Sequence, residues 1–280
     1  MSLTEAVIRH YTRADIAARI LAALREAAGA DVAVTPEALA PFDHFHSRGV
    51  TATAALLALL APAPGDALLD IGSGIGGPAR WIAARTGCAV TGVDLTPEFT
   101  TAAIALAAAT GQSPQLRFLT GSALDLPLAD TTFDRAWSQN VVMNIEDKPC
   151  FYRQARRVLK PGGMLALSNL AAGPAGPPRY PLPWAAGAET SFLATPAATR
   201  AELEASGFEI VAFQDTSEAV AAFNEAMRAR ARAEGHAGAA SGSGMAVLVG
   251  EAMAERQRNS ARGITEGTLV TLEILARRIG

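Results

Sequence analysis

Short apolar runs alternate with helix-like stretches through the middle of the chain. Each run is brief and bounded by turn residues, which is typical of strands in a covered sheet. The predicted strands are residues 67–71, 88–95, 116–124, 133–142 and 164–170. After the second of them, Thr96 is a predicted helix N-cap, Pro97 suits the first helical position and Gly111 ends the helix. Strands that alternate with helices predict a parallel sheet with right-handed crossovers.

Helical segments flank this unit. Apolar positions recur near helical spacing between residues 4 and 28 and again in residues 51–60, whereas residues 40–50 break the pattern and predict a loop. The elements expected after residue 170 are a Pro/Gly/Ala-rich insertion, a helix at 198–206, a strand at 207–215, a helical hairpin at 217–262 and a last strand at 267–278.

Composition narrows the class of protein. The chain has 280 residues, of which 50% are hydrophobic, enough for one large domain with an added cap. A net charge of −3 offers no obvious basic face for nucleic acid. No apolar run reaches the ~18 residues of a membrane span. Two cysteines outside any metal-type spacing, and an N-terminus without a signal-peptide core, favour a cytoplasmic protein that has no disulfide framework and no membrane partner.

A glycine-rich turn follows the first predicted strand. In LLDIGSGIGGPAR, residues 68–80, three glycines match the dinucleotide pattern G-x-G-x-x-G, so an NAD-type oxidoreductase is one hypothesis. Asp70 stands directly before the turn, where a carboxylate repels a pyrophosphate and attracts a cation. S-adenosylmethionine (SAM) carries a sulfonium and an ammonium and no phosphate, so Asp70 favours SAM. Asp94, 24 positions later, can accept both ribose hydroxyls of either cofactor.

Four segments, taken in order, carry a family resemblance. LLDIGSGIGGPAR, VTGVDLTPEF, GSALDLPLADTTFDRAWS and RVLKPGGMLALSN resemble the successive motifs of class I SAM-dependent methyltransferases, over about residues 65–170. The chain is similar in particular to the small-molecule branch with sarcosine/dimethylglycine N-methyltransferases and sterol or tocopherol C-methyltransferases. FDHFHSRGVTAT, residues 42–53, resembles an upstream segment that lies over the methionine end of SAM in such proteins.

The resemblance implies an α/β fold. We expect a Rossmann-like, mostly parallel seven-stranded sheet with an antiparallel last strand, an N-terminal helical cap, and insertions after the fifth and sixth strands. The expected parts are a cap with a SAM-covering loop at 1–62, a SAM-binding core at 63–170, a Pro-rich lid at 171–200 and the C-terminal part of the core at 201–280, which includes a helical insertion at 217–262. That helical insertion is the candidate surface for a homodimer.

The resemblance also implies a set of cofactor-binding residues. They are Tyr11, Asp70, Gly72, Ser73, Gly74, Gly76, Asp94, Leu95, Ser122, Ala123, Gln139 and Asn140. Asp70 and the glycines would shape the methionine pocket, and Asp94 would hold the ribose. Ser122 departs from the family pattern, since many relatives have an acid there that accepts the adenine amino group. Its hydroxyl can still accept that hydrogen bond.

Candidate catalytic residues come from two segments. Asn144 occupies a position where several O-methyltransferases of this fold carry a histidine general base, and an amide cannot take a proton. His44 and His46, beside Asp43, are the alternative bases, or they orient SAM or the substrate. The D-H-x-H spacing lacks a distant fourth ligand, so we expect no metal site.

The acceptor pocket is expected between the cap and the Pro-rich insertion. Its candidate substrate-binding residues are Asp43, Arg179, Tyr180, Trp184 and Phe192. The aromatic side chains would either face a methylated ammonium through cation–π attraction or anchor the insertion to the core. The leading hypothesis is methyl transfer from SAM to a small molecule, with an amine nitrogen ahead of carbon or oxygen of an apolar acceptor. An NAD-dependent oxidoreductase and a SAM-binding protein without turnover are the alternatives.

Overall fold

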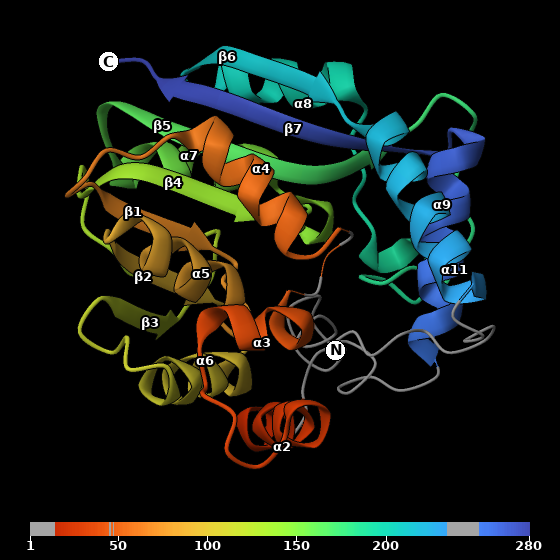
Figure 1. Ribbon diagram of the computed structural model, residues 1–280. Helices are drawn as coiled ribbons and strands as arrows, with labels where there is room; N and C mark the ends of the chain where they lie inside the picture. Colours follow the sequence, from red (N-terminus) through yellow and green to blue (C-terminus); the bar gives the residue numbers. More distant parts are fainter. Residues whose placement is uncertain (1–14, 45, 47, 234–251) are drawn as a thin grey trace.

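A seven-stranded sheet forms the centre of the molecule, in the order β3-β2-β1-β4-β5-β7-β6 (Figure 1). The computed structural model describes residues 15–44, 46, 48–233 and 252–280. The strands are β1 Ala67–Ile71, β2 Ala89–Asp94, β3 Leu116–Thr120, β4 Phe133–Gln139, β5 Leu159–Ala172, β6 Phe208–Asp215 and β7 Leu269–Arg278. The first five strands are parallel, and β7 runs antiparallel to both β5 and β6. The expected fold class is confirmed.

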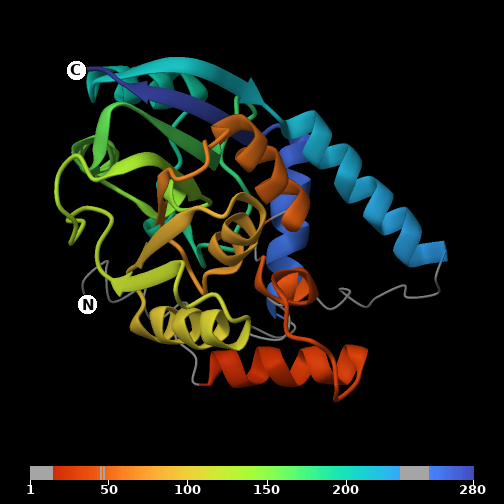
Figure 2. The ribbon, with the colours of Figure 1, turned by 60° about the vertical axis from the view of Figure 1, so that its left-hand side comes forward.

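Helices cover both faces of the sheet. They are α2 Ile16–Ala28, α3 Pro36–Asp43, α4 Val50–Leu60, α5 Gly77–Thr86, α6 Pro97–Ala109, α7 Lys148–Val158, α8 Pro196–Ala205, α9 Ser217–Ala233 and α11 Ala252–Glu266, with short 3-10 turns η1 Val142–Asn144 and η2 Ala188–Thr190. One core layer joins α4, α5 and α6 to the sheet, and a second joins α7 and α8 to the opposite face. Figure 2 shows α9 extending away from the sheet, and α2 lying below α6. No helix in the described ranges is long and apolar enough to cross a membrane.

Several boundaries differ from the sequence prediction. The third and fourth strands end at Thr120 and Gln139, before the predicted residues 124 and 142. Residues 40–50 were predicted to be a loop, but α3 begins after the N-cap Thr35 and runs to Asp43, whose side chain pairs with Arg80 of α5. The fifth strand begins at Leu159, not at residue 164. Pro161 disfavours the α conformation for the residue before it, so the preceding helix ends early and the chain is already extended at that point.

A buried ion pair holds α3 against α5. Arg80 is fully buried, and its guanidinium donates to the Ile75 carbonyl at 2.7 Å and to Asp43 Oδ2 at 2.6 Å. Gly77 allows this approach, because a Cβ there would collide with the Asp43 carbonyl oxygen. Five residues on, Arg85 pairs with Glu37 of the same two helices at 2.8 Å, but in solvent.

We expect Arg80→Met to destabilise the protein far more than Arg85→Met. The first change leaves the Asp43 carboxylate buried beside no cation, which typically costs about 3–5 kcal/mol. The second removes an exposed pair of about 0.2–1 kcal/mol. Urea unfolding of the two variants measures both free energies. Equal losses would contradict the assignment of the Arg80–Asp43 pair as the contact that holds α3 to α5.

Candidate functional site

The glycine-rich turn between β1 and α5 forms a backbone cradle. Gly72, Gly74 and Gly76 have φ values of 80°, 52° and 75°, a left-handed conformation that other residues rarely adopt. The Gly72 N–H donates to the Val93 carbonyl at 2.7 Å, and the Ser73 N–H donates to the same oxygen at 3.1 Å. The turn is therefore folded back against β2, at the N-terminus of α5.

Asp94 closes the same edge of the sheet. Its Oδ2 accepts from the Gly74 N–H at 2.8 Å, and its Oδ1 accepts from the Thr96 N–H at 2.9 Å. Burial raises the pKa of the Asp94 carboxyl, and these two backbone hydrogen bonds oppose that rise. Each carboxylate oxygen is thus fixed in position while retaining a lone pair for a further donor.

Asp70 is the unsatisfied charge of the site. The residue is 2% exposed, and its Oδ2 has no hydrogen-bond partner within the described part of the chain. Burial raises the pKa of this carboxyl well above its usual range, and the nearby Asp94 charge raises it further. A buried carboxylate without a partner is unfavourable, so this position is chemically suited to a cationic ligand.

The end of α3 presents an oriented histidine. The carboxylate of Asp43 is only an acceptor, so the His44 ring donates through Nδ1, which lies 3.0 Å from Asp43 Oδ1. Nε2 of His44 is buried without a hydrogen-bond partner among the described residues. Arg80 holds the other oxygen of Asp43. The pair Arg80–Asp43 therefore fixes the imidazole with Nε2 available as an acceptor.

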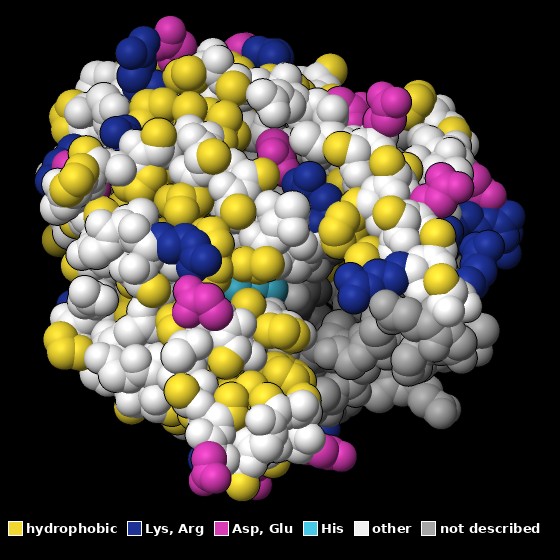
Figure 3. Space-filling view, viewed as in Figure 1, with side chains coloured by type: hydrophobic (Ala, Val, Ile, Leu, Met, Phe, Trp, Pro, Cys, Tyr) yellow, Lys and Arg dark blue, Asp and Glu magenta, His cyan; other side chains and the backbone are white. Residues whose placement is uncertain are grey.

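A chain of contacts leads from His46 to the end of β4. His46 Nε2 lies 3.3 Å from the Thr53 hydroxyl, and that hydroxyl donates to Gln139 Oε1 at 3.4 Å. The two imidazole rings of His44 and His46 meet edge to face, with 5.7 Å between centroids. Figure 3 shows histidine at the edge of a hollow between the α3–α4 side of the molecule and the α9–α11 side.

The remaining predicted cofactor residues follow the carboxyl edge of the sheet. Leu95 comes directly after β2, and the half-buried Ser122 and Ala123 follow β3. The Ser122 hydroxyl already accepts from the Leu124 N–H at 3.1 Å. Asn140 follows β4 with φ 56°. Nearby, Asn144 ends η1, and its Oδ1 has no partner in the described structure. Tyr11 lies outside the described residues.

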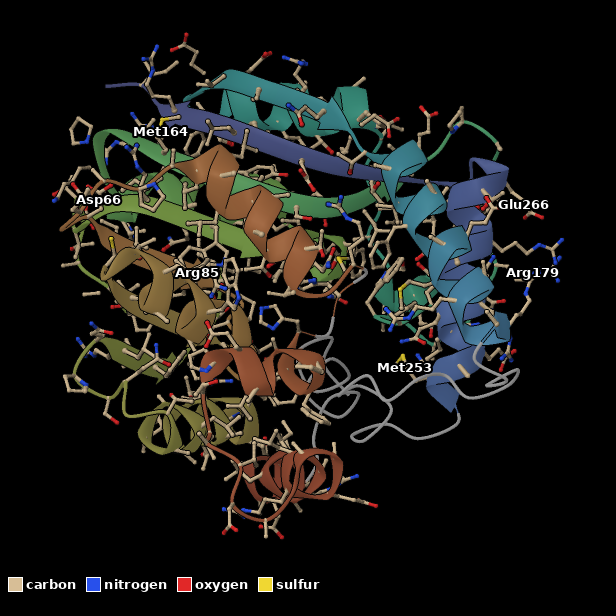
Figure 4. The ribbon with its side chains drawn as sticks, viewed as in Figure 1. Asp66, Arg85, Met164, Arg179, Met253 and Glu266 are labelled. Atoms are coloured by element: carbon tan, nitrogen blue, oxygen red, sulfur yellow. The ribbon has the colours of Figure 1, made fainter. Side chains whose placement is uncertain are left out.

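The insertion after β5 is anchored through its aromatic residues. Trp184 is 4% exposed, donates from Nε1 to the Ser191 hydroxyl at 3.0 Å and packs with Met143. Tyr180 packs against the same apolar cluster. The Phe192 N–H donates to the Met143 carbonyl at 2.8 Å. Trp184 thus acts as an anchor of the insertion. Arg179 is exposed and points outward, away from the other candidate residues (Figure 4).

Lys148 is a site-supporting residue that the sequence analysis missed. It is 5% exposed, and its ammonium donates to the Ile145 carbonyl at 2.6 Å and to the Phe192 carbonyl. It therefore ties the insertion to the turn that follows β4. One signal was present: a lysine directly after the N-cap Asp147 opposes the helix dipole, which makes it an unusual choice unless it has another partner.

Comparison with known proteins bears on the chemistry of this site. Residues 69–167 match the family described as "Methyltransferase domain". The chain is 32% identical over 128 residues to methyltransferase GfsG of Streptomyces halstedii, covering 46% of each protein. It is 30% identical over 155 residues to glycine/sarcosine/dimethylglycine N-methyltransferase of Actinopolyspora halophila, covering 55% of this chain and 27% of that one. The chain spans less than half the length of these relatives.

Solved structures share the fold over a longer range. Geranyl diphosphate C-methyltransferase of Streptomyces coelicolor A3(2) superposes with a TM-score of 0.72 at 18% identity, covering 100% of this chain and 99% of that one. The [4+2]-cyclase SpnF superposes with a TM-score of 0.64 at 25% identity, covering 82% of each chain. The chain therefore shares its fold with these two proteins over most of its length.

We expect Asp70→Asn to stabilise the ligand-free protein at neutral pH while weakening its cofactor binding. Because the pKa of Asp70 is raised in the folded state, the folded protein keeps a proton on this carboxyl that the unfolded chain has already lost. The stability of the wild-type protein therefore falls as the pH rises from the usual Asp pKa range through the raised pKa. The asparagine side chain of the variant does not titrate, so the variant avoids this loss of stability. It also lacks the negative charge that attracts a cation. Thermal unfolding against pH, together with calorimetry of S-adenosylhomocysteine (SAH), tests both effects. A variant with unchanged SAH affinity would exclude Asp70 from the site.

Proposed function

Residues 69–167 form a class I SAM-dependent methyltransferase domain, and from this premise we propose that the protein transfers a methyl group from SAM to a nitrogen of a small-molecule amine. The single observation that carries the cofactor half of the proposal is the buried Asp70 carboxylate, whose Oδ2 has no hydrogen-bond partner among the described residues. SAM, when bound, supplies an electrophilic methyl group on its sulfonium. The activity, the acceptor and the lid role of residues 171–200 are parts of the proposal.

Each residue of the cradle then has a distinct task. Asp70 neutralises the cationic methionine end, and the left-handed glycines, which carry no side chain, leave room for that end beside the turn. Asp94 accepts the ribose hydroxyls with oxygens that Gly74 and Thr96 already hold in place. Gln139 faces the site from the end of β4, and its Nε2 has no partner among the described residues. Orientation of this kind can lower a barrier by about 7–11 kcal/mol.

The absence of a proton acceptor at Asn144 favours an amine. A neutral amine attacks a methyl sulfonium directly once its own proton has gone to water. An amide side chain at Asn144, the position of the histidine base in some methyltransferases of this fold, does not hinder that attack. An alcohol, by contrast, needs a base to become a useful nucleophile.

Transfer to oxygen, or to an acidic carbon, is the second candidate, and His44 is the observation that favours it. Its imidazole is oriented by Asp43 and presents an Nε2 that has no hydrogen-bond partner in the part of the chain that the structure describes. This arrangement resembles the His–Asp part of a general-base system. Relatives of this chain include N-, O- and C-methyltransferases by name, so the residues around the acceptor decide between these outcomes.

We expect purified protein to move label from isotope-labelled SAM into amines. The amine acceptors in the test are glycine, sarcosine and phosphoethanolamine. A hydroquinone and geranyl diphosphate serve as the oxygen and carbon acceptors, and a fractionated small-molecule extract is tested beside them. Asp94→Ala is the control, since it should abolish transfer through loss of cofactor binding. Label that enters only hydroxyl or carbon acceptors would reject the amine and move the second candidate to first place.

His44→Gln separates the two candidates. For an amine acceptor we expect turnover within about tenfold of wild type at alkaline pH, where the amine is already neutral, because a general base contributes typically 10²–10⁴-fold only where it is needed. SAH affinity, measured by calorimetry, controls for damage to the cofactor site. A loss of about 100-fold or more that alkaline pH does not repair would establish His44 as a base.

A further inference from the structure

Three polar residues form a row across the sheet beside the cofactor site. Gln139 of β4 is the register partner of Ser168 of β5, and Ser168 is the register partner of Glu273 of β7. Paired residues on neighbouring strands point to the same face, at about 4.8 Å per strand. Glu273 therefore lies on the same face as Gln139, about two strand spacings or ~10 Å away.

The row lies on the α4 face of the sheet, one step beyond the apolar core. Two positions earlier on β4 and β5, and two positions later on the antiparallel β7, Trp137, Ala166 and Leu275 pack with Leu56 and Leu60 of α4. Toward the carboxyl edge the same face changes from apolar to polar. Ser168 and the next outward residue on β5, Leu170, are only half-buried, and Leu170 packs against the cluster that contains Trp184.

Arg48 fixes the far end of this row. Its Nη2 donates to Glu273 Oε1 at 2.5 Å, and the side chains are 13% and 8% exposed. Arg48 precedes α4 with φ 65°, a left-handed conformation unusual for a non-glycine residue. The near end is held through Thr53, whose hydroxyl reaches Gln139. Both ends of the row are thus set by residues 48–53, the segment that also follows the histidines.

The charge of Glu273 is not explained by stability. A largely buried ion pair can commonly be replaced by apolar residues of similar volume without loss of stability, so its presence next to the apolar core points to a recognition role. Arg48 approaches through one oxygen, Oε1, and thereby orients the carboxylate. A carboxylate is an acceptor only, so the matching ligand group is a hydrogen-bond donor.

We propose that Glu273, held by Arg48, is the specificity-determining residue for the acceptor and receives an ammonium or hydroxyl group on it, ~10 Å from the methylated atom near Gln139. The acceptor is therefore a small molecule with two polar ends, and the part between them passes Ser168 and the half-buried Leu170. This inference rests on the proposed function, because it takes Gln139 as the position of the cofactor's reactive end.

The test measures probe binding to SAH-saturated protein by calorimetry. SAH occupies Asp70, which removes the competing carboxylate. The probes are 2-phenylethylamine, 2-phenylethanol and 2-phenylethyl methyl ether, which share a skeleton and offer an ammonium, a hydroxyl and no donor. The double variant Arg48→Met/Glu273→Met removes both charges of the ion pair and leaves neither charge buried without its partner. Glu209→Gln is the matched control, because Glu209 pairs with Arg277 of β7 in solvent, away from the row.

Wild type should prefer the amine or the alcohol over the ether by about tenfold or more, the scale of a hydrogen bond to a charged group. The double variant should reduce that preference to about twofold while SAH affinity stays within about twofold of wild type, and Glu209→Gln should keep the full preference. No preference in wild type, or a preference that survives in the double variant, overturns the proposal. Failure of SAH to bind wild type would instead reject the proposed function.

Discussion

The constraint on which the site depends is the pair of carboxylates at the ends of β1 and β2. Asp94 is satisfied by two backbone N–H groups, whereas Asp70 is buried beside it, and its Oδ2 has no partner in the described ranges. Their mutual repulsion and burial make the ligand-free site unfavourable. A ligand that brings a cation to Asp70 and hydroxyl groups to Asp94 offsets both the repulsion between the carboxylates and the cost of burying them. The parallel sheet supplies this geometry, since the carboxyl ends of adjacent strands meet at one edge.

One short segment, residues 43–53, connects that edge to the rest of the molecule. Asp43 contacts Arg80 at the start of α5, Thr53 contacts Gln139 at the end of β4, and Arg48 contacts Glu273 of β7. The cofactor cradle and the two ends of the proposed acceptor site, Gln139 and Glu273, are therefore contacted by residues close together in the sequence. A displacement of this segment would disturb all three together, which is why its anchoring by a fully buried arginine matters.

Local signals made much of this predictable from sequence. Strand alternation, the glycines before α5 and the acids at the ends of β1 and β2 all lie within a few residues of the structure that they specify. The antiparallel last strand followed from the family resemblance. Contacts between distant residues could not be predicted in this way. Arg48 and Glu273 are 225 positions apart, and Arg80 meets Asp43 across 37. Such pairs follow from how the cap packs on the sheet, which no local pattern encodes. The outward position of Arg179 has the same origin.

Proton release on SAH binding, measured calorimetrically in buffers of different ionisation enthalpy, tests the role of Asp70 most directly. At mildly acidic pH the raised pKa leaves part of Asp70 protonated in the free protein, and a bound cation lowers that pKa again. Wild type should therefore release protons on binding SAH, and Asp70→Asn should release fewer. Equal proton release by both proteins, or none by wild type, would contradict the assignment of Asp70 as the residue that receives the cationic end of the cofactor.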